Sequence, residues 1–140
     1  MSEQWNGKKC PVCSEGTLKQ HAKATRFEYR GRILEYDQEG AWCDVCGEGI
    51  VTGEEAAESE SLLDDFMIRV HKEEASELGR IRRRLGLTQK EASLIAGGGH
   101  NAFSRYERGE ARPVAAVLNL FRLLDRHPEL LRELKTQTAA

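Results

Sequence analysis

All four cysteines of the chain lie in two short units of identical spacing, Cys10-Pro11-Val12-Cys13 and Cys43-Asp44-Val45-Cys46. Two residues between the cysteines of a pair allow a tight turn to point both sulfurs at one place. Two such turns supply four soft ligands in a tetrahedron, which suits one structural zinc ion per chain. Because the four cysteines complete the ligand set, no position stays open for an activated water, and zinc catalysis is not expected.

Three other uses of the cysteine pairs have to be weighed against structural zinc. Two disulfides do not suit a chain that is expected in the cytosol, where thiols are kept reduced. A thioredoxin-like redox pair requires a βαβ setting, and no such pattern surrounds either pair. Iron also binds four thiolates, so the spacing alone leaves iron open beside zinc.

A second set of candidate residues, between residues 88 and 112, is of the kind that binds DNA. Asn101 and Arg105 are spaced by four and share one face of a helix with Arg108. Asn can pair bidentately with adenine and Arg with guanine, so Asn101 and Arg105 are the candidates for reading bases. The candidates for contacts to the DNA backbone are Thr88, Gln89, Lys90, Ser104, Arg108 and Arg112, with the amides of Thr88 and Gln89 at a helix N-terminus suited to a phosphate. Taken singly, each is equally an exposed residue of a small helical bundle, and only the ordered set favours DNA binding.

These residues fall on a predicted helix-turn-helix. Residues 80–85 end a first helix at Gly86, and the capping box of residues 88–91 opens a second helix that continues to residue 95. Residues 97–99, all glycine, form the turn, and residues 100–108 form a third helix that stops at Gly109. Two short helices joined by a glycine-containing turn are the helix-turn-helix arrangement. Two further helices, over residues 114–125 and 129–134, complete the core of the domain.

The segment between the cysteine pairs is predicted to form short strands. Residues 26–29 alternate polar and aromatic side chains, Arg30-Gly31 suits a turn, and residues 33–36 form the returning strand. A second turn is expected over residues 37–40, which leads into residues 41–43. A module this small has little room for an apolar core, so its stability is expected to depend on the metal.

A helical segment connects the two parts. Thr52 and Glu55 form a capping-box pattern. An apolar stripe at helical spacing follows it, interrupted by Gly79: Leu62, Leu63, Phe66, Met67, Val70, Ala75, Leu78, Ile81 and Leu85. The pattern fits either one long helix or a helix broken by a linker near residues 71–76. The expected domains are a zinc-binding module over residues 1–53, a connecting helix or linker over 54–76, and a helix-turn-helix DNA-binding domain over 77–140.

The charge of the chain is divided unevenly. The net charge is −2, but residues 1–73 hold 9 Lys and Arg against 15 Asp and Glu, whereas residues 74–140 hold 12 against 8. A basic half is the usual footprint of a nucleic-acid binder, although two solvated surfaces of opposite sign give the same counts. The N-terminus is polar, and no apolar run approaches the roughly 18 residues of a membrane helix, so a cytoplasmic location is expected. No nucleophile–base set and no open metal site is found, so no enzymatic activity is expected.

Four segments and the two cysteine pairs together make the chain resemble a known family. The segments are Leu87-Thr88-Gln89-Lys90-Glu91-Ala92-Ser93, Gly97-Gly98-Gly99, Asn101-Ala102-Phe103-Ser104-Arg105-Tyr106-Glu107 and Asp125-Arg126-His127-Pro128-Glu129-Leu130-Leu131. With Cys-Pro-Val-Cys and Cys-Asp-Val-Cys before them, they resemble the MqsA antitoxin family, in which a YgiT-type zinc finger precedes an XRE-type helix-turn-helix. The resemblance covers nearly the whole chain.

The resemblance implies a fold class, a function and partners. The implied fold is an α+β, zinc-ribbon-like N-terminal module followed by an all-α helix-turn-helix domain of the XRE/Cro type. The implied function is that of an antitoxin of a type II toxin–antitoxin system. Such a protein represses its own operon as a homodimer on palindromic double-stranded DNA, read here by Asn101 and Arg105, and its zinc domain neutralises an MqsR-like or other ribonuclease toxin. The alternative is a stand-alone XRE-family regulator whose zinc module is structural or senses metal.

Overall fold

The computed structural model describes residues 2–138 and divides into two compact units, which meet between Ile68 and Arg69. The N-terminal unit contains η1 (Ser2–Trp5), β1 (Leu18–Tyr29), β2 (Arg32–Cys43), β3 (Gly49–Ile50) and the first half of helix α1 (Gly53–Arg84). The C-terminal unit contains the rest of α1, α2 (Gln89–Ala96), α3 (Ala102–Glu107), α4 (Ala115–Arg126), η2 (Pro128–Leu130) and α5 (Leu131–Thr138). Within the described residues, no helix combines the length and the apolar character needed to span a membrane.

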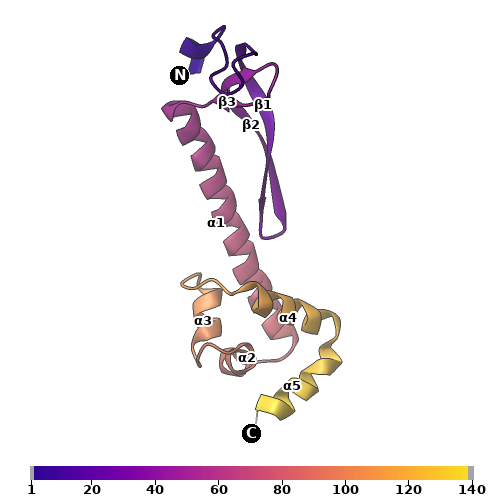
Figure 1. Cartoon of the computed structure of the whole chain (residues 1–140). Helices are drawn as coiled ribbons and strands as arrows, with labels where there is room; N and C mark the ends of the chain where they lie inside the picture. The colour runs from indigo at the N-terminus through magenta and orange to yellow at the C-terminus, as the bar shows by residue number, and fades with distance from the viewer. Residues whose placement is uncertain (1, 139–140) are drawn as a thin grey trace. The chain divides into compact units, whose positions relative to one another are not determined.

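The N-terminal unit is organised by one long hairpin (Figure 1). β1 and β2 pair antiparallel over their whole length, from Leu18 opposite Cys43 to Tyr29 opposite Arg32. The predicted turn at Arg30-Gly31 is confirmed: both residues are left-handed, with φ of 50° and 78°. Two central residues with positive φ match the right-handed twist of the strands that they join.

The second predicted turn, over residues 37–40, is wrong. These residues continue β2, and they pair with β1 from Ala24 opposite Asp37 to His21 opposite Gly40. Their residue types favour a bend locally, but pairing along the full length of β1 outweighs that preference. Gly40 has a different role, because a Cβ there would lie only 3.0 Å from the carbonyl oxygen of Ile50. A glycine therefore allows β3 to approach β2 closely.

The first turn of α1 is joined to the N-terminal segment through the carboxylate of Glu55. The backbone N and the hydroxyl of Ser2 donate to its Oε1 at 3.1 and 2.6 Å, and the amide of Thr52 donates to its Oε2 at 3.2 Å. Burial of Glu55 raises its pKa, but the hydrogen bonds from Ser2, Thr52 and Gln20 outweigh burial and lower the pKa to about 2. Glu55 thus remains charged although only 8% of its surface is exposed.

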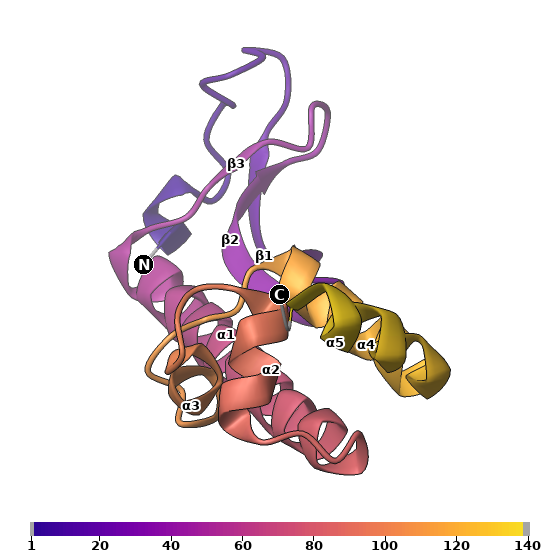
Figure 2. The same ribbon diagram turned by 90° about the horizontal axis from the view of Figure 1, so that it is seen from below.

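The C-terminal unit has an apolar core of its own. Leu78 and Ile81 of α1 are fully buried together with Phe103 of α3 and Phe121 of α4. The two phenylalanine rings lie 4.7 Å apart between centroids. α1 is helical through residues 71–76, where the sequence left a linker open. Figure 2 shows α2 and α3 of this unit close together beside the last turns of α1.

The order of the elements confirms the predicted fold class. A cysteine-bearing antiparallel sheet is followed by an all-helical region.

Candidate metal centre and nucleic-acid interface

The four cysteines come together at one end of the sheet. Cys10 and Cys13 precede β1, Cys43 ends β2, and Cys46 follows it. Their Sγ atoms all lie within 4.8 Å of one another, and the Cys10–Cys46 and Cys13–Cys43 pairs are each 3.7 Å apart. A disulfide would bring two sulfurs to about 2.05 Å. Four sulfurs at about 2.3 Å from a zinc ion form a tetrahedron with edges of about 3.8 Å, so the observed spacing fits zinc.

Backbone amides point at the sulfurs of Cys10, Cys13 and Cys43. The N···S distances are 3.4 Å for Val12 to Cys10, 3.3 Å for Gly16 to Cys13, 3.3 Å for Val45 to Cys43 and 3.4 Å for Cys46 to Cys43. The amides of Gly16 and Glu15 lower the pKa of Cys13 to about 6, and the amide of Cys46 lowers the pKa of Cys43. One cysteine of each pair, Cys13 and Cys43, is therefore favoured as the thiolate, the form that metals bind.

Cys46 and Gly16 show why the cluster suits a cation. The amide of Glu48 lowers the pKa of Cys46, but burial and the neighbouring thiols outweigh it and raise the pKa to about 12. The neighbouring thiols thus disfavour a thiolate at Cys46 unless a cation compensates the charge. A Cβ at Gly16 would lie 2.2 Å from the Sγ of Cys43, so any side chain there would enter the cluster. The chemistry and the spacing of the donor set both fit a four-sulfur metal site.

The predicted capping box at the start of α2 is confirmed. The amide of Glu91 donates to the hydroxyl of Thr88 at 3.1 Å, and the amide of Thr88 donates to the carboxylate of Glu91 at 3.0 Å. The Thr88 amide, which we expected to face a phosphate, is therefore already used within the protein. The turn that follows α2 consists of three glycines with φ of 80°, 88° and 93°, values that side chains rarely permit.

α3 presents one face to the core and another to solvent. It begins at Ala102, two residues later than expected, with Asn101 at its N-cap. Phe103 is fully buried against Phe121, while Asn101, Arg105 and Arg108 are exposed. The structure thus places the two candidate base readers on an accessible surface, and their contact with bases stays a prediction.

The other candidates for DNA backbone contacts differ in their surroundings. Lys90 and Arg112 are exposed, and Ser104 is half-buried. The side chain of Gln89 is engaged within the protein, because its Nε2 donates to the carboxylate of Glu107 at 3.1 Å. Arg108 pairs with an acidic neighbour at the surface, at 3.1 Å from Glu110.

Ser93 is a supporting residue that sequence reasoning missed. Its hydroxyl accepts from the amide of Phe103 at 2.9 Å and donates to the carbonyl of Gln89 at 2.7 Å. The side chain is 1% exposed, so this bond joins α2 to the first turn of α3 inside the core. A serine within an amphipathic helix gives no local signal of such a role.

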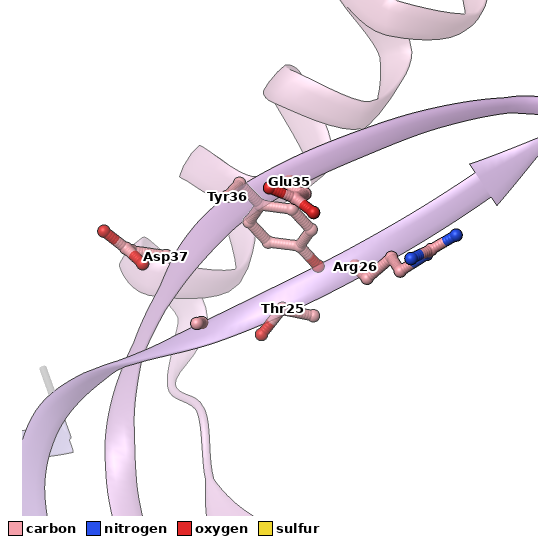
Figure 3. Close-up of a pocket in the computed structure, with 6 residues that line it drawn as sticks. Thr25, Arg26, Glu35, Tyr36 and Asp37 are labelled. Carbon is pink, nitrogen blue, oxygen red and sulfur yellow. The ribbon is translucent and has the colours of Figure 1, made fainter.

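The hairpin carries an open hollow of about 380 Å³, lined by residues of β1 and β2. Figure 3 shows the ring of Tyr36 reaching from β2 across to β1, near Thr25 and Arg26, while Asp37 points away from it. Arg26 lies opposite Glu35 in the register. The lining combines the hydroxyls of Thr25 and Tyr36 with the carboxylates of Glu35 and Asp37.

Comparisons with known proteins agree on one family. A family profile described as the antitoxin component of a bacterial toxin–antitoxin system, MqsA, matches residues 8–135. The chain is 41% identical over 131 residues to Antitoxin MqsA of Escherichia coli (strain K12), covering 91% of this chain and 99% of that protein. A solved structure of the N-terminal domain of the E. coli protein MqsA is 30% identical, with a TM-score of 0.41, and covers 44% of this chain and 94% of that one.

Proposed function

The chain belongs to the MqsA antitoxin family, and from this membership we propose how its two units divide the work of an antitoxin. The N-terminal unit holds one structural zinc ion and neutralises a ribonuclease toxin. The C-terminal unit represses its own operon as a DNA-binding homodimer on a palindromic site. The observation that carries the proposal is the presence, in one chain, of a closed four-cysteine cluster and a helix-turn-helix with Asn101 and Arg105 exposed on α3.

Charge and rigidity support the DNA-binding role of the C-terminal unit. Residues 69–140 hold 14 Lys and Arg against 9 Asp and Glu, an excess that favours contact with phosphates. α3 is anchored by the fully buried Phe103, which fixes the direction in which Asn101 and Arg105 point. One short helix reads few bases, and proteins of this kind pair two copies on two half-sites.

Binding to the DNA upstream of the protein's own gene tests this role. We expect Arg105→Ala to weaken binding by about 1–3 kcal/mol and to relax the preference at one base pair. Arg126→Ala is the matched control, because Arg126 is an exposed arginine at the end of α4. Equal loss from both variants, or no loss when Asn101→Ala and Arg105→Ala are combined, would contradict base reading by α3.

The negative charge of the N-terminal unit favours binding to a positively charged partner. Residues 1–68 hold 7 Lys and Arg against 14 Asp and Glu. A ribonuclease must attract RNA phosphates, so its binding surface carries positive charge that an acidic unit complements. Co-expression with the adjacent gene tests the pairing: growth arrest by the neighbour alone, relieved by this chain, is the expected result. A neighbour that is harmless alone argues instead for a stand-alone regulator.

We propose zinc as the ion of this cluster, because four cysteine ligands with no open position are typical of structural zinc sites. The 3.7 Å sulfur pairs agree with zinc–sulfur bonds of about 2.3 Å in a tetrahedron. Elemental analysis of the purified chain should give one zinc per chain and a colourless protein. A coloured protein with one iron per chain would contradict zinc and leave the four-cysteine site itself in place.

A further inference from the structure

A partly buried ion pair connects α1 to the last residue of α3. The carboxylate of Glu107 accepts from Nε and Nη2 of Arg82 at 2.9 and 3.0 Å, a two-point contact of fixed geometry. The side chains of the two residues are only 15% and 12% exposed. Arg82 also donates to the carbonyl oxygen of Leu87 at 3.0 Å, which fixes the connection between α1 and α2.

The same carboxylate reaches the other helix of the helix-turn-helix. Gln89, the first residue of α2, donates from Nε2 to Oε2 of Glu107 at 3.1 Å. Glu107 therefore joins three helices: α3, which carries it, α1 through Arg82, and α2 through Gln89. Arg82 also compensates a negative charge at the end of α3, where an unpaired carboxylate would repel DNA phosphates.

Gly79 gives this carboxylate the space that it occupies. A Cβ at position 79 would lie 2.8 Å from Oε1 of Glu107 and 3.2 Å from Nη1 of Arg83. Gly79 lies inside a 32-residue helix, where glycine is a poor helix former. Its backbone has no positive φ that would require glycine. The close approach of the Glu107 carboxylate is thus the reason that the structure offers for a glycine here.

We propose that Glu107, seated against Gly79 and held by Arg82 and Gln89, is a positioning residue that sets the orientation of α3 on DNA. The inference rests on the proposed DNA-binding function. Base contacts require placement to within about 0.5 Å, whereas contacts to phosphates tolerate small shifts. Displacing the carboxylate therefore lowers sequence-specific binding and leaves non-specific binding nearly unchanged.

Gly79→Ala in the full-length chain tests the proposal. Affinity is measured by fluorescence anisotropy on a duplex from upstream of the protein's own gene and on a scrambled duplex of equal length and composition. We expect about a tenfold loss on the first duplex, the size of one weakened base contact, and less than a twofold loss on the second. The thermal midpoint should change little, because the better helix propensity of alanine offsets the weakened contacts of Glu107. Gly53→Ala, where nothing lies within 4 Å of the added Cβ, is the control and should change neither affinity.

A double variant shows whether Gly79 acts through Glu107. In Glu107→Ala the carboxylate is gone, so adding Gly79→Ala should cost less than a further twofold. Full additivity of the two losses overturns the inference, as does wild-type specificity in Gly79→Ala. An equal loss on both duplexes with a lowered thermal midpoint also overturns it, because this is the result of a purely structural role. A wild-type chain that does not distinguish the duplexes overturns the proposed function itself.

Discussion

Removing the metal should unfold the N-terminal unit and leave the C-terminal unit folded. The buried cluster at the metal site consists of Cys10, Leu18, Ala41 and Cys43, so Leu18 and Ala41 are its buried apolar members apart from the proposed ligands. Full burial of a leucine contributes about 1.5–3 kcal/mol, whereas fixing the backbone of each residue costs about 1–2 kcal/mol. A structural zinc ion contributes on the order of 10–16 kcal/mol in small zinc modules, and so it is the dominant stabilising term at this site.

The positions of the two tryptophans allow the units to be followed separately. Trp5 packs against the cysteine cluster and Trp42 lies in β2, so both report on the N-terminal unit. A strong zinc chelator should shift their emission to the red as they meet water. The far-UV circular dichroism of the helices in the C-terminal unit should persist, because Leu78, Phe103 and Phe121 form their core without the metal.

Substitution should reproduce the effect of the chelator. Cys10→Ser removes a buried proposed ligand and should shift the emission without any chelator. Val45→Ala is the control, because Val45 lies between two of the cysteines but its side chain is 62% exposed. The reasoning from core size is refuted if a metal-binding dye records full release of the metal while the tryptophan emission stays unchanged.

Three further outcomes follow from single contacts. Ser93→Ala removes the acceptor of the buried Phe103 amide and should cost about 1–3 kcal/mol in urea unfolding followed by circular dichroism; an unchanged midpoint contradicts this. Gly98→Ala places a side chain at φ +88° and should lower stability by about 1–2 kcal/mol in the same assay, whereas Gly53→Ala should not. The pKa of Glu55 is lowered to about 2, so its contribution to stability is present above its ordinary pKa of 4.5 and lost as the pH falls towards 2. Glu55→Gln should flatten the acid dependence of tryptophan-detected unfolding in that window, and an equal dependence in both proteins would refute the assignment.

The features that the sequence predicted correctly depend on neighbours in the chain. The capping box of Thr88 and Glu91 spans four residues, and the hairpin turn at Arg30-Gly31 spans two. Each forms through local hydrogen bonds or backbone conformations, which the residue types specify directly. The cysteine pairs are also local, and their identical spacing was enough to predict that four sulfurs meet at one point.

The features that the sequence missed or mistook depend on partners far along the chain. Residues 37–40 look like a turn until β1 pairs with them. Arg82 stands beside Arg83 and Arg84, and nothing local shows that Arg82 makes the close contact with Glu107, 25 residues away, while Arg83 reaches it only at 3.9 Å. Ser2 and Glu55 are 53 residues apart, and neither residue type indicates that the other is its hydrogen-bond partner. Such pairs form because the folded chain packs the two residues together. This packing cannot be read from a single sequence.

The two units are stabilised by different means, which bears on how an antitoxin of this design can fail. α1 gives Phe66 to the N-terminal unit, where it meets Phe27, and Leu78 to the C-terminal core. The first unit is proposed to depend mainly on cysteines that a metal holds together, and the second has a core of apolar side chains. Oxidation or metal loss therefore acts on the unit proposed to bind the toxin, and it spares the core beneath the proposed DNA readers. If the proposed functions hold, a chain without its metal should still bind its operator and no longer restrain the toxin, so that neutralisation and repression are separable in one molecule.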